Sequence, residues 1–280
     1  MDIGILKTFI EVNRTRHFGK AAENLFLTQS AVSARIRLLE QTIGAELFTR
    51  SRNNIELTPT GHKLLKHAET ILNTWNRARQ EIAMKDPDDI SLAIGGVSSL
   101  WDILLQSWLD NLLENNPNLS ATAEVHSPEV LVRKLIDGAL DLIFMFEATQ
   151  MPEVRVEEVG QINLVLVSSN KGTSIEEAFK NYVLVDWGTS FAITHAQHFP
   201  DIPPPKLRAH IGRLAYNHIL QSGGCAYLAE STVSEELKNK TLHIVTDAPV
   251  IKRMAYAAYM PTSEKKDLIK TAINDLAKPG

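Results

Sequence analysis

The sequence predicts a multidomain chain with an α-rich winged helix-turn-helix head, a long dimerising linker helix and a C-terminal α/β domain. Three observations predict this arrangement. Short amphipathic helices joined by a tight turn occupy the beginning of the chain, a heptad pattern follows them, and strands then alternate with helices to near the end. A chain of 280 residues is long enough for two or three such domains.

Charge is distributed unevenly along the chain. Residues 1–85 contain 13 lysines and arginines against 8 aspartates and glutamates, a net charge of +5; because the whole chain carries −4, the remainder carries −9. A basic N-terminal portion on an acidic body is typical of a head that binds a polyanion. Many enzymes carry a comparable basic patch, so charge alone leaves both classes open.

The composition favours a cytoplasmic protein. The single cysteine, Cys225, excludes an internal disulfide and a cysteine-based zinc site. The N-terminal stretch carries charges throughout and lacks the apolar segment of a signal peptide. No apolar run approaches the ~20 residues needed to span a bilayer. We therefore expect a cytoplasmic protein that does not bind a membrane.

Three helices are predicted in the head. The first presents an apolar face formed by Leu6, Phe9, Ile10 and Val12. A second is predicted over residues 20–26. Thr28 is a suitable N-cap for a third helix that runs to about Ile43, where Gly44 can end it in a left-handed conformation. The inward positions of this third helix are Val32, Ile36 and Leu39.

A wing and a long helix are predicted next. Strands over residues 46–50 and 55–57 flank the turn residues Arg52-Asn53-Asn54. Thr58 and Pro59 then fit the N-cap and first residue of a helix of about 26 residues. Packing of this helix on the chain's own C-terminal domain is one reading. Its heptad seam favours dimerisation through a second copy, by Leu64, Ala68, Ile71, Trp75, Ala78 and Ile82.

Strands and helices alternate after the break at residues 85–89. This alternation predicts parallel α/β sheets, and residues 148–160, which lack a strong pattern, fit a crossover between two subdomains. The predicted strands cover residues 90–97, 121–125, 141–146, 162–168, 182–187, 207–211, 225–228 and 242–245. The predicted helices cover residues 101–113, a segment starting at 127–128, and segments near 174–180 and 213–222.

Four motifs of the head follow one another in a specific order: FGKAAENL, LTQSAVSARIRLLE, G-x-x-LFTR and LTPTG. In this order and spacing they resemble the DNA-binding head of the LysR-type transcriptional regulators. The segments RTRHFG, RNNI and TQSAVS, with a tryptophan in the linker helix, are most similar to the HdfR branch of that family. The C-terminal portion matches through SLW, LDLI and Gly223-Gly224-Cys225.

The resemblance implies a homotetramer, built as a dimer of dimers, that binds double-stranded promoter DNA and responds to a small-molecule effector. For the HdfR branch it also implies control of motility genes. The effector domain is implied to have two lobes like those of periplasmic binding proteins, with a ligand cleft between them. The expected boundaries are a DNA-binding domain over 1–58, a dimerisation helix over 59–86 and an effector-binding domain over 87–280, with lobe I about 87–160 plus 255–280 and lobe II about 161–254.

The outward face of the predicted recognition helix suggests how DNA is read. Gln29 and Arg37 are the candidates for reading bases, because glutamine can recognise adenine and arginine can recognise guanine through paired hydrogen bonds in the major groove. Ser30 and Ser33 fit phosphates or base edges, and Thr28 caps the helix and contacts phosphate. The alternatives are local capping by Gln29 and an ion pair of Arg37 with Glu40 or Glu23.

Three further arginines are DNA-contact candidates. A position that often carries arginine in this family is Ala34 here, and we expect Arg35 to compensate. Arg52, on the wing, is expected to enter a narrow minor groove. For Arg50, a structural role in packing and a contact with phosphate are equally expected.

The predicted effector cleft begins at Ser98 and Ser99, where a strand becomes a helix. Free N–H groups there attract anions, especially carboxylates, although a simple N-cap role for either serine is the alternative. A glutamate in the cleft would disfavour an anionic ligand unless it turned away, so the ligand's charge stays open. The other predicted cleft residues are Phe146, Glu147, Thr189, Ser190 and Phe191.

The sequence contains no G-x-S-x-G, H-E-x-x-H, P-loop or C-x-x-C motif. We therefore expect no enzyme, no metal site and no cofactor. His195 and His198 form an H-x-x-H pair for which a surface or loop role is expected, and Trp187 and Tyr182 are expected in the core. Two alternatives to a ligand-modulated regulator stay open: a ligand-independent architectural DNA-binding protein and a cytoplasmic α/β enzyme with an interaction module.

Overall fold

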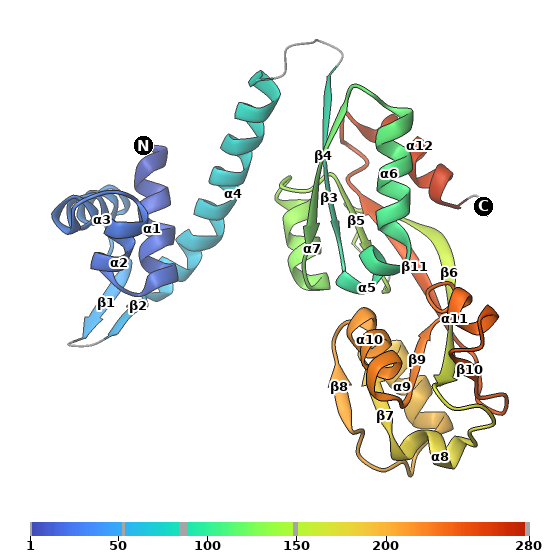
Figure 1. Cartoon of the computed structure of the whole chain (residues 1–280). Coiled ribbons are helices and arrows are strands. Elements are labelled where there is room, and N and C mark those ends of the chain that lie inside the picture. Colours follow the sequence, from blue (N-terminus) through green and yellow to red (C-terminus); the bar gives the residue numbers. More distant parts are fainter. Residues whose placement is uncertain (1, 52–53, 84–88, 148–150, 278–280) are drawn as a thin grey trace. The chain divides into compact units, whose positions relative to one another are not determined.

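The computed structural model describes residues 2–51, 54–83, 89–147 and 151–277 (Figure 1). The chain divides into two compact units, the first over residues 1–87 and the second over most of the chain from residue 88 onward. Each unit has its own hydrophobic core. Within the described residues, no helix combines the length and the apolar character that crossing a membrane requires.

The head is a three-helix unit whose apolar faces meet in one core, where Phe9 and Ile36 are completely buried. Its third helix begins at the predicted cap, because the Thr28 hydroxyl accepts a hydrogen bond from the Ala31 N–H at 3.2 Å. It ends at Gly44, which has a φ of 77°. Both predicted ends of this helix are confirmed. The three helices are α1 (Ile3–Thr15), α2 (Phe18–Asn24) and α3 (Gln29–Ile43).

The second helix is displaced from its predicted range. It starts at Phe18 because the ring Nδ1 of His17 accepts the N–H groups of Gly19 and Lys20, at 3.0 and 3.2 Å. It ends at Asn24, before the predicted residue 26. Phe26 has a φ of 54° and is 96 % exposed, so it belongs to the turn that precedes α3.

The predicted hairpin and linker helix are both present. β1 (Phe48–Ser51) pairs antiparallel with β2 (Asn54–Leu57), while Arg52 and Asn53 of the turn lie outside the described residues. α4 (Pro59–Ala83) is 25 residues long. The Thr58 hydroxyl accepts the N–H of Gly61 at 3.0 Å, which confirms the predicted cap.

The described part of the second unit is built on a nine-stranded sheet of order β4-β3-β5-β11-β6-β9-β7-β8, with β10 paired to β6. β3 pairs parallel with β4 and β5, and β7 pairs parallel with β8 and β9, as predicted. The strands are β3 (Ile90–Gly96), β4 (Leu119–Val125), β5 (Leu142–Met145), β6 (Arg155–Ser168), β7 (Tyr182–Val185), β8 (Leu207–Ala209), β9 (Cys225–Ala229), β10 (His243–Ile244) and β11 (Ile251–Tyr259).

Two central strands depart from the expected parallel sheets. β11 pairs antiparallel with β5 and with β6, and β6 pairs antiparallel with β9. β6 has 14 residues and starts at Arg155, inside the segment expected to be an unpatterned crossover. β6 and β11 therefore connect two lobes, each with a parallel core, through one continuous sheet (Figure 1).

Helices cover both faces of the sheet in the first lobe. α6 and α12 pack on one face, where the Trp108 indole N–H donates to the Ala272 carbonyl at 2.8 Å, and α7 packs on the other with Leu131 and Leu135. The helices are α5 (Ser98–Leu100), a π-helical segment η1 (Trp101–Leu105), α6 (Gln106–Asn115), α7 (Pro128–Ile136), α8 (Ile175–Lys180), α9 (Thr189–His198), α10 (Gly212–Ser222), α11 (Ser234–Lys238) and α12 (Lys266–Ala277).

α9 corrects one prediction and its surroundings confirm another. His195, expected on the surface or in a loop, is buried in this helix, and its Nε2 lies 3.0 Å from the Tyr182 hydroxyl. His195 is not exposed because it lies on the side of α9 that packs against apolar residues. Tyr182 and Trp187 are buried, as predicted.

Candidate nucleic-acid interface and interlobe cleft

α3 presents one face to the head core and the opposite face to solvent. Its predicted inward residues are all buried. Gln29, Ser30 and Arg37 are exposed, Ser33 is half-buried, and Thr28 at the cap is exposed as well. The structure thus brings these five DNA-contact candidates onto one end and one side of a single helix.

Gln29 and Arg37 are available to an external partner. Within the described part of the chain, neither side chain takes part in a hydrogen bond or an ion pair. The Glu40 carboxylate accepts the Leu47 N–H at 2.9 Å, which ties the end of α3 to the start of the wing. Of the proposed alternatives, neither capping by Gln29 nor an ion pair of Arg37 is formed among these residues.

Arg35 has a different position from Arg37. It is half-buried, and its Nη1 lies 3.2 Å from the Thr8 hydroxyl and 3.4 Å from the Gly4 carbonyl oxygen, to which it donates. These bonds attach α3 to α1. The first role of Arg35 is therefore to hold the recognition helix in place, and compensation for Ala34 stays a prediction.

The wing arginines are only partly covered by the structure. Arg50 belongs to β1, but its side chain is not among the described ones, and Arg52 lies outside the described residues. Their contacts with DNA stay predictions. The strand pairing itself places Arg50 on the hairpin that follows α3.

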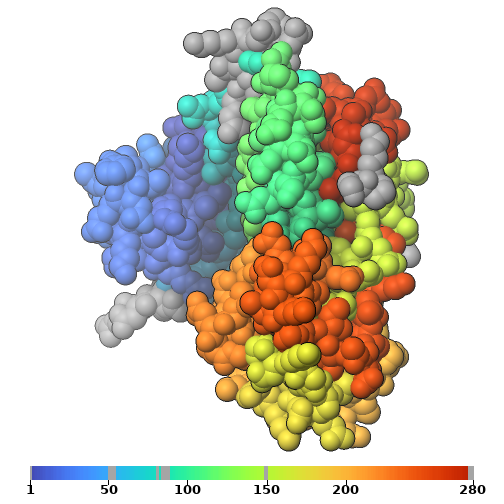
Figure 2. Space-filling view, turned by 45° about the vertical axis from the view of Figure 1, so that its right-hand side comes forward, coloured from blue at the N-terminus to red at the C-terminus, as the bar shows by residue number. Residues whose placement is uncertain are grey.

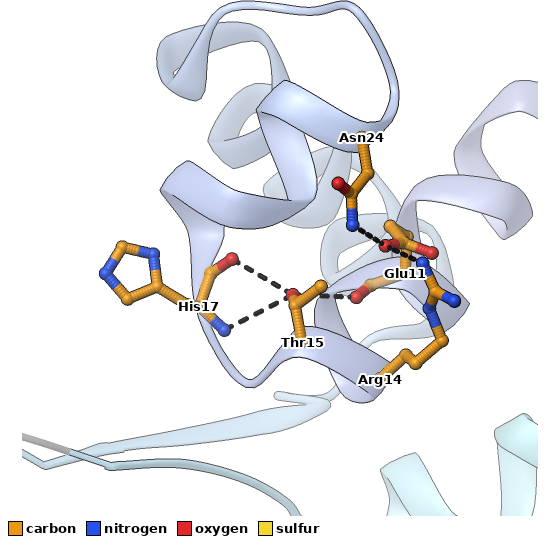
Figure 3. Close-up of polar contacts among 5 residues, drawn as sticks. All are labelled: Glu11, Arg14, Thr15, His17 and Asn24. Carbon is orange, nitrogen blue, oxygen red and sulfur yellow. Dashed lines mark hydrogen bonds and ion pairs between the residues drawn. The ribbon is translucent and has the colours of Figure 1, made fainter.

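A polar network fixes the corner between α1 and α2 (Figure 3). The Glu11 carboxylate accepts hydrogen bonds from Arg14 Nη2 at 2.8 Å and from Asn24 Nδ2 at 2.7 Å. The bond from Arg14 lowers the pKa of Glu11. The Thr15 hydroxyl donates to the Glu11 carbonyl at 2.9 Å and accepts the His17 N–H at 3.4 Å. Because α2 packs against α3, this corner helps to set the orientation of the recognition helix.

The predicted dimerisation stripe on α4 divides into two parts. Ala68 is completely buried and Leu64 packs against the head core, so both are used within the protomer. Ile71 and Trp75 are 38 % and 45 % exposed, and Ile82 is also exposed. Ala78 is half-buried. The outer part of the stripe therefore leaves apolar surface free for another helix.

A cavity of about 460 Å³ lies between the two lobes. The first lobe contributes the carboxyl ends of β3, β4 and β5, and the second those of β7 and β8. Open α/β sheets bind ligands at this edge, where loops and helix N-termini gather. The cavity is lined by Val97, Ser98, Ser99, Val125, His126, Ser127, Pro128, Phe146, Glu147, Asp186, Trp187, Gly188 and His210.

Four predicted cleft residues, two serines and the Phe146–Glu147 pair, line this cavity. Val97 occupies the N-cap position before the helical run, so neither Ser98 nor Ser99 is the cap. Thr189, Ser190 and Phe191 are not lining residues; they are the first three residues of α9, directly after the lining residue Gly188.

Sequence reasoning missed several polar lining residues, among them His126, Asp186 and His210. Each follows directly after a strand, β4, β7 or β8, so the ends of the predicted strands were the signal that would have found them. The Glu124 carboxylate accepts hydrogen bonds from His126 at 2.7 Å and from Lys134 at 2.5 Å. Burial acts to raise the pKa of Glu124, but these two bonds outweigh it and lower the pKa.

The floor of the cavity covers a buried arginine. Arg253 of β11 is 2 % exposed, and its Nη2 donates to Glu147 Oε1 at 2.7 Å. Its guanidinium carbon lies 5.1 Å from the centre of the Phe146 ring. The Glu147 charge is thus compensated by Arg253, which removes the expected objection to an anionic ligand.

An ion pair joins the two lobes. Arg213 Nε of α10 lies 3.0 Å from Asp102 Oδ1 of the π-helical segment. In Figure 2 the green surface of the first lobe meets the orange surface of α10. The two lobes are therefore in direct polar contact with each other.

The two units match two known domain families. Residues 3–62 match the bacterial regulatory helix-turn-helix proteins of the lysR family, and residues 86–278 match the LysR substrate binding domain. The chain is 40 % identical over 273 residues to the HTH-type transcriptional regulator HdfR of Escherichia coli O139:H28, with 96 % of each chain covered. The protein of the same name from Shigella dysenteriae serotype 1 gives the same identity and coverage.

Solved structures show the same fold. CbnR, a LysR family transcriptional regulator, superimposes with a TM-score of 0.78 at 17 % identity and 100 % coverage of both chains. Full-length CbnR complexed with its target DNA gives a TM-score of 0.74 at 19 % identity, with 99 % of each chain covered. The predicted fold class, a winged helix-turn-helix head with a two-lobed α/β domain, is confirmed.

Proposed function

Because the chain belongs to the LysR family of DNA-binding transcriptional regulators, we propose that it reads an inverted-repeat promoter site through Gln29 and Arg37. The observation that carries this proposal is the contrast on α3. Arg35 is bonded to α1, whereas Gln29 and Arg37 are exposed and without partners among the described residues. Amide and guanidinium groups of this kind make paired hydrogen bonds to adenine and guanine.

Self-association supplies the second half-site. Ile71, Trp75 and Ile82 leave apolar surface free on α4, and such a stripe packs against its copy in a second protomer. A two-fold dimer presents two recognition helices and therefore requires a site with matching symmetry. The proposed assembly is a dimer of dimers, as the family resemblance implies.

The interlobe cavity is the proposed effector site. Its lining combines hydroxyls, imidazoles, carboxylates and the Trp187 ring, a mixture suited to a small polar molecule. A ligand that prefers one arrangement of the lobes would shift the population toward it and change how the heads engage DNA. An architectural DNA-binding protein has no need of such a cavity, so the cavity favours the ligand-modulated reading.

Selection of sheared genomic DNA by the full-length protein, near physiological salt, tests the proposal. Wild type is compared with Arg37→Ala and with Arg133→Ala, which removes an exposed arginine of α7 in the other unit. We expect wild type and Arg133→Ala to recover the same few fragments with a two-fold-symmetric motif, and Arg37→Ala to lose them.

Uniform, salt-sensitive recovery by all three proteins would mean phosphate binding alone and would overturn the role of Arg37. The recovered fragments also decide whether motility genes are among the targets, which the resemblance to the HdfR branch predicts.

A further inference from the structure

The guanidinium of Arg253 lies directly beneath the cleft, enclosed by residues that line it. A Cβ atom built on Gly188 would stand 3.0 Å from Arg253 Nη2 and 2.9 Å from Glu147 Oε1. Phe146 covers one face of the guanidinium. Arg253 comes from the strand β11 that serves both lobes, Glu147 follows β5 of the first lobe, and Gly188 precedes α9 of the second. A group bound at Arg253 would therefore touch both lobes.

The hydrogen bonds of this guanidinium are incomplete. Nε is buried and is the one buried side-chain nitrogen or oxygen without a partner in the described part of the chain. Nε and Nη2 lie on the same edge of an arginine and together match the two oxygens of a carboxylate. Glu147 Oε1 occupies Nη2 alone, so this edge is half-filled.

Glu147 can leave this position more easily than Arg253 can. The Glu147 side chain is 42 % exposed, whereas that of Arg253 is 2 % exposed. The released carboxylate would regain water at the cavity wall. No lysine or arginine is found among the described residues that line the cavity. Arg253 is not itself a lining residue, but it lies against the lining residues Phe146, Glu147 and Gly188 and supplies a positive charge behind them, while His126 and His210 are on the walls.

We propose that the effector carries a carboxylate that replaces Glu147 on Arg253 and accepts hydrogen bonds from Nε and Nη2 together. This inference rests on the proposed effector site and names the ligand's chemical class, an organic anion. The ligand supplies acceptors for both Nε and Nη2 of the buried Arg253, whereas Glu147 bonds Nη2 alone. The hydrogen bond between Arg253 and Glu147 is thereby replaced by hydrogen bonds between Arg253 and the ligand, which contacts both lobes.

Chemical rescue with acetate tests this without knowledge of the natural effector. Full-length wild type, Glu147→Ala and the exposed-site control Glu153→Ala are titrated with sodium acetate at constant ionic strength, and the melting midpoint is followed. Acetamide, which has the same size and no charge, is the control ligand. We expect acetate to bind Glu147→Ala at least tenfold more tightly than wild type or Glu153→Ala, with no comparable effect of acetamide.

Three results would overturn the inference: no response of Glu147→Ala to acetate, an equal response in wild type and Glu147→Ala, or an equal response to acetamide. If Glu147→Ala does not fold, Glu147→Gln keeps the volume and one acceptor and is judged by the same comparisons. If neither variant folds, the wild-type protein provides the test: acetate must raise its melting midpoint above the value measured in acetamide, and equal midpoints would refute the inference. Failure of DNA selection, by contrast, would refute the proposed function and leave this acetate response measurable.

Discussion

Replacing Gly61 by alanine tests how the linker helix is joined to the head. A Cβ atom at Gly61, in the first turn of α4, would stand 2.2 Å from the Leu47 carbonyl oxygen and 2.9 Å from Leu57 Cδ2. The Leu47 oxygen is a backbone atom that already accepts the Thr58 N–H at 2.9 Å. It cannot rotate away, so α4 must shift or this hydrogen bond must break.

The expected cost follows from these contacts. Overpacking of this kind costs ~1–3 kcal/mol, and loss of the Thr58–Leu47 hydrogen bond adds about 1 kcal/mol. The higher helix preference of alanine offsets about 1 kcal/mol. We expect the free energy of unfolding to fall by about 2 kcal/mol, which lowers the melting midpoint of a unit of this size by roughly 10 °C.

Scanning calorimetry of the full-length protein provides the measurement, with two other glycines as controls. Gly44→Ala meets no atom within 4 Å but must adopt a φ of 77°, at a cost of ~1 kcal/mol. At Gly160 a Cβ atom meets no neighbour within 4 Å and φ is not positive. The free energy of unfolding of Gly160→Ala should therefore stay within about 0.5 kcal/mol of wild type. A Gly61→Ala protein that melts together with Gly160→Ala would refute the close approach of α4 to residue 47.

Three further predictions concern other parts of the chain. Burial lowers the pKa of His195, so its contribution to the free energy of unfolding should be fully present above the ordinary histidine pKa of about 6.5. This contribution should decrease as the pH drops below that value, because the unfolded chain then binds a proton that the folded chain does not. Melting curves of His195→Gln should lose this part of the pH dependence. Trp75→Ala should weaken self-association by tenfold or more in sedimentation experiments, as loss of an aromatic anchor costs about 2 kcal/mol, whereas Arg79→Ala, also exposed on α4, should not. Burial raises the pKa of the Cys225 thiol, so the native protein should react with a disulfide reagent at pH 8 only as fast as it opens, and rapid reaction would contradict the packing of β9.

α3 could be predicted to the residue because its ends are determined locally. The Thr28 hydroxyl bonds an N–H three residues away, and Gly44 adopts the left-handed conformation that ends the helix. The same holds for the start of α4 at Thr58. Where a helix start depends on an unusual cap, as at His17 for α2, the predicted boundary was displaced.

The centre of the second unit could not be predicted in this way. β11 pairs with β5, although more than a hundred residues separate their sequences, and Arg253 meets Glu147 across 106 residues. No local pattern encodes such a pairing. α9 was also missed, because only Phe191 and His195 of its ten residues are buried and the apolar periodicity is weak. The strand ends that carry most of the cleft were predictable, whereas its floor depended on the long-range topology.

The late position of β11 in the sequence determines the order in which the nascent protein can mature. β5 of the first lobe has β11, residues 251–259, as its antiparallel neighbour, and α12 after it covers the same lobe. The head and linker helix, in contrast, are complete by Ala83. Domains of a growing chain fold from the N-terminus as they emerge from the ribosome. A chain that ends before residue 251 would therefore carry a complete winged helix-turn-helix head on an α/β domain that cannot complete its sheet, so the head would be separated from a working interlobe cleft.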